Sequence, residues 1–171
     1  MPQKIRNLPD REPLDRTDRE LVALLQQDAR LTNKELAARI GLAESSTLAR
    51  VRRLVERGVF AGFHAAVAPW ALGVGLQALV AVRLSRNARD AVERFRDHCR
   101  RIPAVVAIYN IAGQDDFLVH VGVRAVDALR ELILGSISSH PDVAHIESHL
   151  IFEALRGPGA TGAVPAKHAA R

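Results

Sequence analysis

The spacing of hydrophobic positions changes near residue 59, and this change divides the sequence into two parts. Before it, apolar residues recur every three or four positions, which is the repeat of one face of an α-helix. Three helices are predicted there, at about 14–28, 33–40 and 44–57. From about residue 75 onward, alternating stretches and helical stretches follow one another, so this part is predicted to contain both strands and helices.

The boundaries of the second and third helices are marked by residues with distinct roles. Thr32 and Glu35 have the spacing of a capping box, in which each side chain bonds a free backbone amide. Gly41 can end a helix in the left-handed conformation at no steric cost, whereas Ala43 has no side chain that can cap the next helix. The apolar spacing of that third helix predicts an inward face made of Leu48, Val51, Leu54 and Val55.

The outward face predicted for 44–57 combines hydroxyl and arginine side chains: Ser45, Ser46, Thr47, Ala49, Arg50, Arg52 and Arg53. Residues near the start of a helix that lies in the major groove of DNA meet base edges, while guanidinium groups bind phosphates or guanine. A helix that is merely solvated can have the same pattern, so the pattern alone leaves both interpretations open. Its position as the last of three short helices favours a helix-turn-helix unit.

The second part of the chain is predicted to contain six elements: strand 76–84, helix 88–101, strand 105–112, strand 117–123, helix 126–138 and strand 143–154. This βαββαβ order is that of a ferredoxin-like sandwich, in which both helices cover one face of an antiparallel sheet. Leu118 falls on the uncovered face, and an apolar residue there favours a dimer formed sheet to sheet.

We therefore expect an α+β protein in which an N-terminal three-helix, winged helix-turn-helix is joined to a C-terminal ferredoxin-like βαββαβ sandwich. The expected parts are a flexible arm (1–13), the helix-turn-helix (14–58), a strand or wing with a linker (59–74), the sandwich (75–156) and a disordered tail (157–171).

The distribution of charge supports different functions for these parts. The net charge is +5, and residues 1–58 hold 12 Lys and Arg against 9 Asp and Glu, whereas residues 59–156 hold 10 of each. The basic excess favours a polyanion partner for the first part, and the neutral second part favours self-association or a small molecule. A single cysteine, Cys99, excludes an internal disulfide, and no signal peptide or membrane span is apparent. We expect a cytoplasmic protein.

Several short motifs together resemble the leucine-responsive/asparagine-responsive regulator (Lrp/AsnC) family. In the first part they are Leu14-Asp15-x-x-Asp18, Asp28-Ala29-Arg30, Glu35-Leu36-Ala37, Gly41-Leu42, Arg50-Val51-x-Arg53-Leu54 and Gly58-Val59. In the second part they are Val105 to Gly113, Asp116-Phe117-Leu118 and the closing strand. The resemblance covers about 14–156, and its strength lies in the order and spacing of these pieces. Ala43, Glu44 and Val55 depart from the family pattern.

The resemblance implies a transcription regulator that binds double-stranded DNA and a small effector, commonly an amino acid, and that forms homodimers and higher oligomers, often octamers. The DNA-facing set it implies is Ser45, Ser46, Thr47, Arg50 and Arg53, to which we add Lys34 and Arg52 as expected phosphate contacts. The effector-binding set is the loop Gly113, Gln114, Asp115 and Asp116, together with Ser148. In that loop, Asp116 is the expected acceptor for the ammonium group of an amino acid.

Two alternatives are kept beside this interpretation. His145, Glu147 and His149 alternate along the last strand, and ligands at alternate strand positions can hold a metal in a metal-responsive regulator. Haem-precursor (sirohaem) decarboxylases share the two-domain plan and use histidines. No nucleophile–base set is apparent, because His98 and Cys99 are consecutive on a helix and point apart. We therefore expect no catalytic residue, no metal, no cofactor and no membrane partner.

Overall fold

The structure, a computed structural model, describes residues 13–86 and 88–155. The described chain forms two compact units that divide between Ala65 and Ala66. Except for Pro13, the arm expected at 1–13 lies outside the described residues, and so does the tail expected at 157–171. Within the described ranges, no helix is long and apolar enough to span a membrane.

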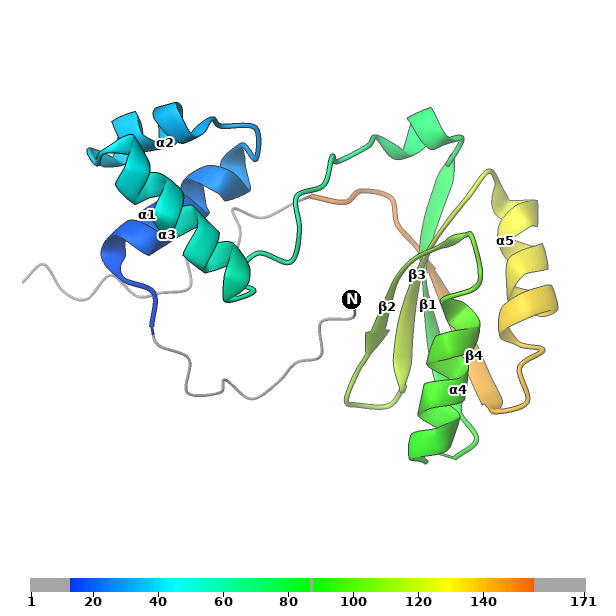
Figure 1. Ribbon diagram of the computed structural model, residues 1–171. Coiled ribbons are helices and arrows are strands. Elements are labelled where there is room, and N and C mark those ends of the chain that lie inside the picture. The colour runs from blue at the N-terminus through cyan, green and yellow to red at the C-terminus, as the bar shows by residue number, and fades with distance from the viewer. Residues whose placement is uncertain (1–12, 87, 156–171) are drawn as a thin grey trace, which may run out of the picture. The chain divides into compact units, whose positions relative to one another are not determined.

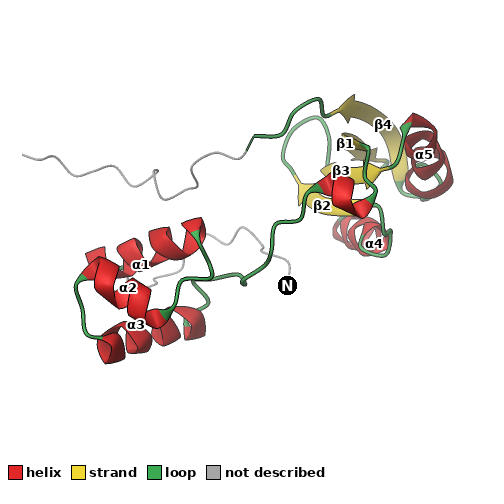
Figure 2. Ribbon diagram, turned by 90° about the horizontal axis from the view of Figure 1, so that it is seen from above, coloured by secondary structure: helices red, strands yellow, loops and turns green. Residues whose placement is uncertain are grey.

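The first unit contains three helices, α1 (Arg16–Gln27), α2 (Asn33–Ile40) and α3 (Glu44–Glu56), as predicted (Figures 1 and 2). Its core is small. Four leucines form its buried centre: Leu21, Leu25, Leu36 and Leu54. The other apolar side chains packed against them, such as Val51, are only partly buried, so the helices depend on further contacts to fix their orientation.

The helix ends follow the predicted chemistry. Thr32 Oγ1 accepts from the Glu35 amide at 3.3 Å, and Glu35 Oε2 accepts from the Thr32 amide at 2.8 Å, which completes the capping box of α2. Gly41 has φ 69°, in the left-handed region that ends α2. Ala43, the N-cap of α3, makes no side-chain hydrogen bond, so α3 begins without a side-chain cap.

The strand or wing predicted after α3 is not formed. Residues 59–68 have no regular secondary structure, and residues 61–68 are exposed. Val59 and Phe60 pack against the leucine core of the first unit instead. An isolated strand cannot pair its backbone groups, so apolar residues alone do not make this segment a strand. A short 3-10 helix, η1 (Pro69–Leu72), leads into the second unit.

The second unit follows the order β1 (Leu76–Leu84), α4 (Arg89–Cys99), β2 (Val105–Asn110), β3 (Phe117–Val123), α5 (Val126–Leu132) and β4 (Val143–Leu150). All strand pairs are antiparallel, and the strand order is β2-β3-β1-β4. Residues of both α4 and α5 join the buried residues of one sheet face in a single core (Figure 1). The ferredoxin-like prediction is therefore confirmed.

Alternation along the strands decides which side chains enter this core. Val80 of β1 pairs with Val119 of β3, and both are fully buried beneath the helices. Phe95 of α4 contacts Phe117 of β3 with their ring centroids 4.9 Å apart. On the opposite face Ala81 pairs with Leu118, as the alternation predicts. That face has no helix over it among the described residues.

Several elements end earlier than predicted, among them α5, β2 and β4. The helix expected at 126–138 is α5 followed by a π-helical turn, η2 (Ile133–Ile137). β2 ends at Asn110, where the chain enters the β2–β3 loop. β4 ends at Leu150, because its partner strand β1 begins at Leu76 and offers only one further hydrogen bond, from the Ile151 amide to the Gln77 carbonyl at 2.9 Å.

Candidate nucleic-acid interface and effector loop

The orientation of α3 differs from the predicted one by roughly 60° around the helix axis. Its buried positions are Thr47 and Leu54, with Arg50 and Val51 half-buried between them. Leu48 and Val55, predicted to face inward, are 38% and 47% exposed. Thr47, predicted to face DNA, is fully buried, and its hydroxyl donates to the Ala43 carbonyl at 3.0 Å. The prediction for Thr47 was wrong because spacing was judged by side-chain hydrophobicity, and the buried stripe contains polar residues.

Two of the predicted phosphate-binding arginines are turned toward α1. Arg50 Nη1 lies 2.6 Å from Asp15 Oδ2 and 2.9 Å from Asp18 Oδ1. Arg53 Nη2 lies 2.8 Å from Asp18 Oδ2. Asp18 is only 1% exposed, so both of its oxygens are satisfied by arginines inside the unit. Both guanidinium groups thus bind α1, while the Arg53 side chain is still 49% exposed, and the role of Arg50 and Arg53 as phosphate contacts stays a prediction.

The network also affects Asp15, which begins α1. Its Oδ1 accepts from the Asp18 amide at 2.7 Å and caps the helix, while its Oδ2 meets Arg50. These contacts, the backbone hydrogen bond first and the arginine second, hold the pKa of the Asp15 carboxyl below its usual value. The carboxylate therefore stays charged at neutral pH and keeps the start of α1 joined to the middle of α3.

The outward face of α3 is formed by residues opposite this network. Ser45, Ala49 and Arg52 follow one another at spacings of four and three residues, and all three are exposed, as is Ser46 on the flank. Lys34, at the start of α2, is exposed as well. Among the described residues, neither Arg52 nor Lys34 has a carboxylate within the 4.0 Å of an ion pair. Asn33 Nδ2 donates to the Glu44 carbonyl at 2.8 Å and joins α2 to the beginning of α3.

The loop between β2 and β3 is built around Asp116. Asp116 Oδ2 accepts from the Leu84 amide at 2.8 Å, and its own amide donates to the Val82 carbonyl at 3.0 Å. Its residue exposure is only 9%. The carboxylate expected to bind an ammonium group is thus already engaged with the end of β1. Gly113, at φ 143°, makes the turn that the loop requires.

The other members of the predicted effector set differ in their distance from the loop and in their exposure. Arg83 Nε donates to the Gln114 carbonyl at 2.9 Å, and Arg83 Nη2 lies 3.7 Å from Asp115 Oδ1. The Gln114 side chain is exposed and the Asp115 side chain is 24% exposed. Ser148 pairs with Val80 on the far side of β1 from β3, so the chain does not bring it beside the loop.

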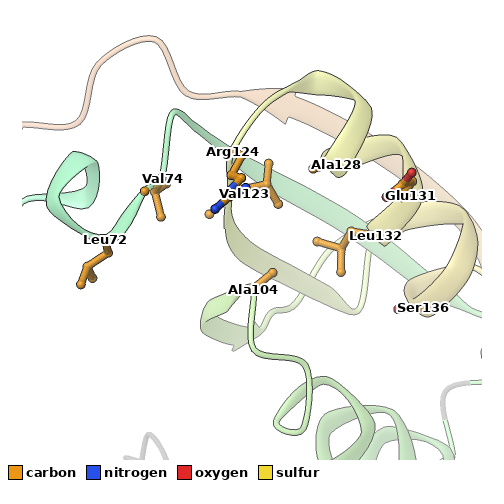
Figure 3. A pocket seen from close by; sticks show the side chains of 11 residues that line it. Leu72, Val74, Ala104, Val123, Arg124, Ala128, Glu131, Leu132 and Ser136 are labelled. Carbon is orange, nitrogen blue, oxygen red and sulfur yellow. The ribbon is translucent and has the colours of Figure 1, made fainter.

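A cavity of about 460 Å³ lies at the other end of the sheet from this loop, where β1 begins and β3 ends (Figure 3). Leu72 and Val74 line it before β1, Arg124 follows β3, and Leu132 belongs to α5. Most of these side chains are apolar. The sequence did not predict this cavity, because its walls come from segments far apart in the chain.

The predicted metal ligands do not converge. His149 Nε2 lies 3.9 Å from Glu147 Oε1, whereas His145 sits beside Arg83 on β1. Throughout the described part of the chain, no group of three or more His, Cys, Asp or Glu side chains is arranged to hold a metal ion. The metal-responsive alternative therefore loses its structural basis.

Sequence reasoning missed Asp18 and Arg83, and a signal for Asp18 was present. Asp18 occupies the apolar stripe of α1 at helical spacing from Leu14, Leu21 and Leu25. A carboxylate on an apolar stripe indicates a buried ion pair. Arg83 gave no such signal, since it alternates onto the open face of β1.

Comparison with known proteins agrees with these two units. A model described as winged helix-turn-helix DNA-binding matches residues 14–60, and a model described as the Lrp/AsnC ligand binding domain matches residues 77–159. The fold and the site therefore define a helix-turn-helix transcriptional regulator with a ligand-binding domain.

Individual relatives specify the family. The HTH-type transcriptional regulator AldR of Mycolicibacterium smegmatis is 43% identical over 144 residues, which cover 84% of each chain. The leucine-responsive regulatory protein of Escherichia coli K12 is 31% identical over 143 residues, 84% of this chain and 87% of the relative. The chain belongs to the Lrp/AsnC family.

Among solved structures, a transcriptional regulator from Neisseria meningitidis in complex with L-Met superposes with a TM-score of 0.79 at 30% identity, covering 85% of this chain and 94% of that one. The relatives named here are transcriptional regulators, and they give the haem-precursor decarboxylase alternative no support.

Proposed function

We propose that this regulator binds double-stranded DNA as a homo-oligomer, through the exposed stripe of α3, and that an amino acid bound near the β2–β3 loop modulates that binding. The observation that carries the DNA proposal is the outward placement of Ser45, Ala49 and Arg52 on the last helix of the three-helix unit. Ser45 and Ser46 lie near the helix start, where side chains reach base edges. Arg52 and Lys34 supply phosphate contacts.

The DNA proposal is tested by replacing Arg52 with Ala and measuring affinity for the segment upstream of its own gene at several salt concentrations. Each lost phosphate contact reduces the slope of log affinity against log salt by about one. We expect R52A to weaken binding and to make the slope shallower. R16A is the matched control, since Arg16 is an exposed cation on α1 that pairs with Glu20 within the described ranges. Equal affinity of R52A and wild type at about 150 mM salt would contradict the proposed face.

The effector proposal rests on the loop 113–116 and on the nature of the relatives. The Neisseria relative is described in complex with L-Met, and the matching domain model is a ligand-binding one. In this loop the Asp116 carboxylate is engaged, so Asp115 is the better acceptor for an ammonium group. The exposed Gln114 amide and the backbone beside Gly113 can receive the carboxylate of the ligand.

Calorimetric screening of the twenty amino acids identifies the ligand, and Asp115→Asn then tests its position. Replacing Asp116 is less informative, because it would leave the Leu84 amide without its acceptor. D115N is expected to weaken amino-acid binding about tenfold or more, the effect of losing one charge-assisted hydrogen bond. D127N, at an exposed position on α5, is the control. If D115N binds like wild type, the cavity lined by Leu72, Val74 and Arg124 is the next place to examine.

The oligomer proposal rests on the open face of the sheet. Leu79 and Leu118, both half-buried, bring apolar surface to that face, and Tyr109 at its edge is 52% exposed. A second copy of the chain that covers this face forms a closed dimer, and dimers can assemble further, as far as an octamer. Sedimentation of L118D, expected to shift the protein toward monomer, tests this arrangement. An unchanged mass would place the interface elsewhere.

A further inference from the structure

The α3 sequence can be oriented in the core of the first unit in two ways, of which the structure shows one. The rotation predicted from hydrophobicity buries Leu48, Val51, Leu54 and Val55. In the observed rotation Leu48 is 38% and Val55 is 47% exposed, while Thr47 is fully buried. The two arrangements share Val51 and Leu54 as inward residues and differ by roughly 60° around the helix axis. Burial of apolar surface alone favours the rotation that is not observed.

The ion-pair network accounts for the observed choice. Asp18 Oδ1 binds Arg50 and Asp18 Oδ2 binds Arg53, at 2.9 and 2.8 Å. Turning α3 into the other arrangement would carry both guanidinium groups away from their places beside Asp18. A carboxylate that is 1% exposed would then be left buried without a cation, which is strongly unfavourable. Asp15 adds a second contact to Arg50 at 2.6 Å and opposes the same rotation.

We propose that Asp18 is a positioning residue, which through Arg50 and Arg53 sets the rotation of α3 and thereby the residues that α3 presents to DNA. In the rotation that Asp18 selects, Ser45, Ala49 and Arg52 face outward. In the competing rotation Leu48 moves inward and Thr47 moves outward. The proposal rests on the proposed function for its effect on DNA, but the rotation itself can be measured without DNA.

Thiol labelling measures the rotation directly. The native Cys99 is fully buried, and burial raises the pKa of its thiol to about 12, so an introduced cysteine is a selective reporter. Without other changes, L48C should be labelled about tenfold faster than T47C in the folded protein, because only position 48 is accessible. Adding Asp18→Asn to each cysteine variant is expected to reduce or reverse this difference in labelling rate. E20Q, which removes one negative charge from the exposed face of α1, is the control and should leave it unchanged.

DNA binding gives the second measurement. D18N is expected to weaken binding about tenfold or more by misplacing the base-contacting side chains, with an unchanged salt slope. R53A should behave the same way, in contrast to R52A, whose slope becomes shallower. The double variant D18N/R53A should lose no more than D18N alone, because D18N already removes the carboxylate that binds Arg53. Circular dichroism checks that each variant is folded. If D18N does not fold, R53A takes its place in both the labelling and the DNA-binding measurements.

The possible results separate the two proposals. If wild type does not bind DNA, the proposed function fails, while the labelling data still test the rotation. If wild type binds and D18N leaves both labelling and affinity unchanged, the positioning role is refuted. If D18N binds DNA more tightly with a steeper salt slope, Arg50 and Arg53 are phosphate contacts that Asp18 holds back, and the proposal is overturned as well.

Discussion

The two units of this regulator are held together in different ways. In the sheet unit, buried apolar side chains from β1, β3, α4 and η2 form one continuous core. In the helical unit only four leucines are buried at the centre, and the orientation of α3 depends on a buried carboxylate and two arginines. A continuous apolar core fixes its strands by alternation, whereas a small helical core needs a specific polar contact to choose between similar packings.

The largest expected effect is on the sheet unit. Phe95→Ala removes a fully buried ring that packs on Phe117, which should cost about 3–5 kcal/mol of stability. Hydrogen exchange followed by mass spectrometry should show loss of protection in β1 and β3 and unchanged protection in α1–α3. Loss of protection in both units would mean that they do not unfold independently.

A smaller effect separates neighbouring positions of the helical unit. Leu54→Ala, at a fully buried position, should destabilise this unit by about 2–4 kcal/mol, whereas Val55→Ala, at a half-exposed one, should cost less than about 1 kcal/mol. Urea denaturation of the two variants measures the difference. Equal losses would indicate that α3 takes the rotation predicted from hydrophobicity.

The sheet unit should also respond to pH, through His140. Its ring packs edge-on against Phe95 and lies 5.0 Å from the His98 ring, and its Nδ1 accepts from the Asp142 amide at 3.2 Å. Arg94 lies nearby, bound to Asp142 at 2.9 Å. Burial, followed by the neighbouring His98, lowers the pKa of the His140 imidazole below 6.5. The unfolded chain therefore binds a proton first, and stability should fall as pH decreases below about 6.5.

The measurement is the urea midpoint of the sheet unit between pH 7.5 and about pH 5, compared between wild type and His140→Gln. The variant should lose the part of the pH dependence that begins near 6.5. Curves that stay parallel for the two proteins would assign the response to another group.

The smallest expected effect is a gain in the stability of the helical unit. Ala43 is the N-cap of α3 and makes no side-chain hydrogen bond, so Ala43→Ser should stabilise the helical unit by about 0.5–1 kcal/mol. Thermal denaturation measures this gain. A serine that leaves the midpoint unchanged would show that its hydroxyl does not accept from an unpaired amide at the start of α3.

The same contrast explains what the sequence could predict. β1 and β3 have the predicted bounds, and Leu118 lies on the predicted face, because alternation follows directly from apolar residues. The rotation of α3 was mispredicted because half of its inward stripe is polar. Thr47 and Arg50 occupy inward positions that the pattern assigned to Leu48 and Val55. Contacts between distant segments, such as Arg83 with the loop at Gln114, follow no local pattern and appear only in the fold.

The hydrogen bond from the Leu84 amide to Asp116 has a further consequence for signalling. It joins the tip of the β2–β3 hairpin to the last residue of β1, the strand that pairs with both β3 and β4. A ligand that draws this carboxylate toward itself leaves the buried Leu84 amide without its acceptor. The loss destabilises the end of the sheet where β1, β3 and β4 lie side by side. Occupancy at the hairpin would then be reported by faster amide exchange at residue 84, far along the chain from the bound molecule.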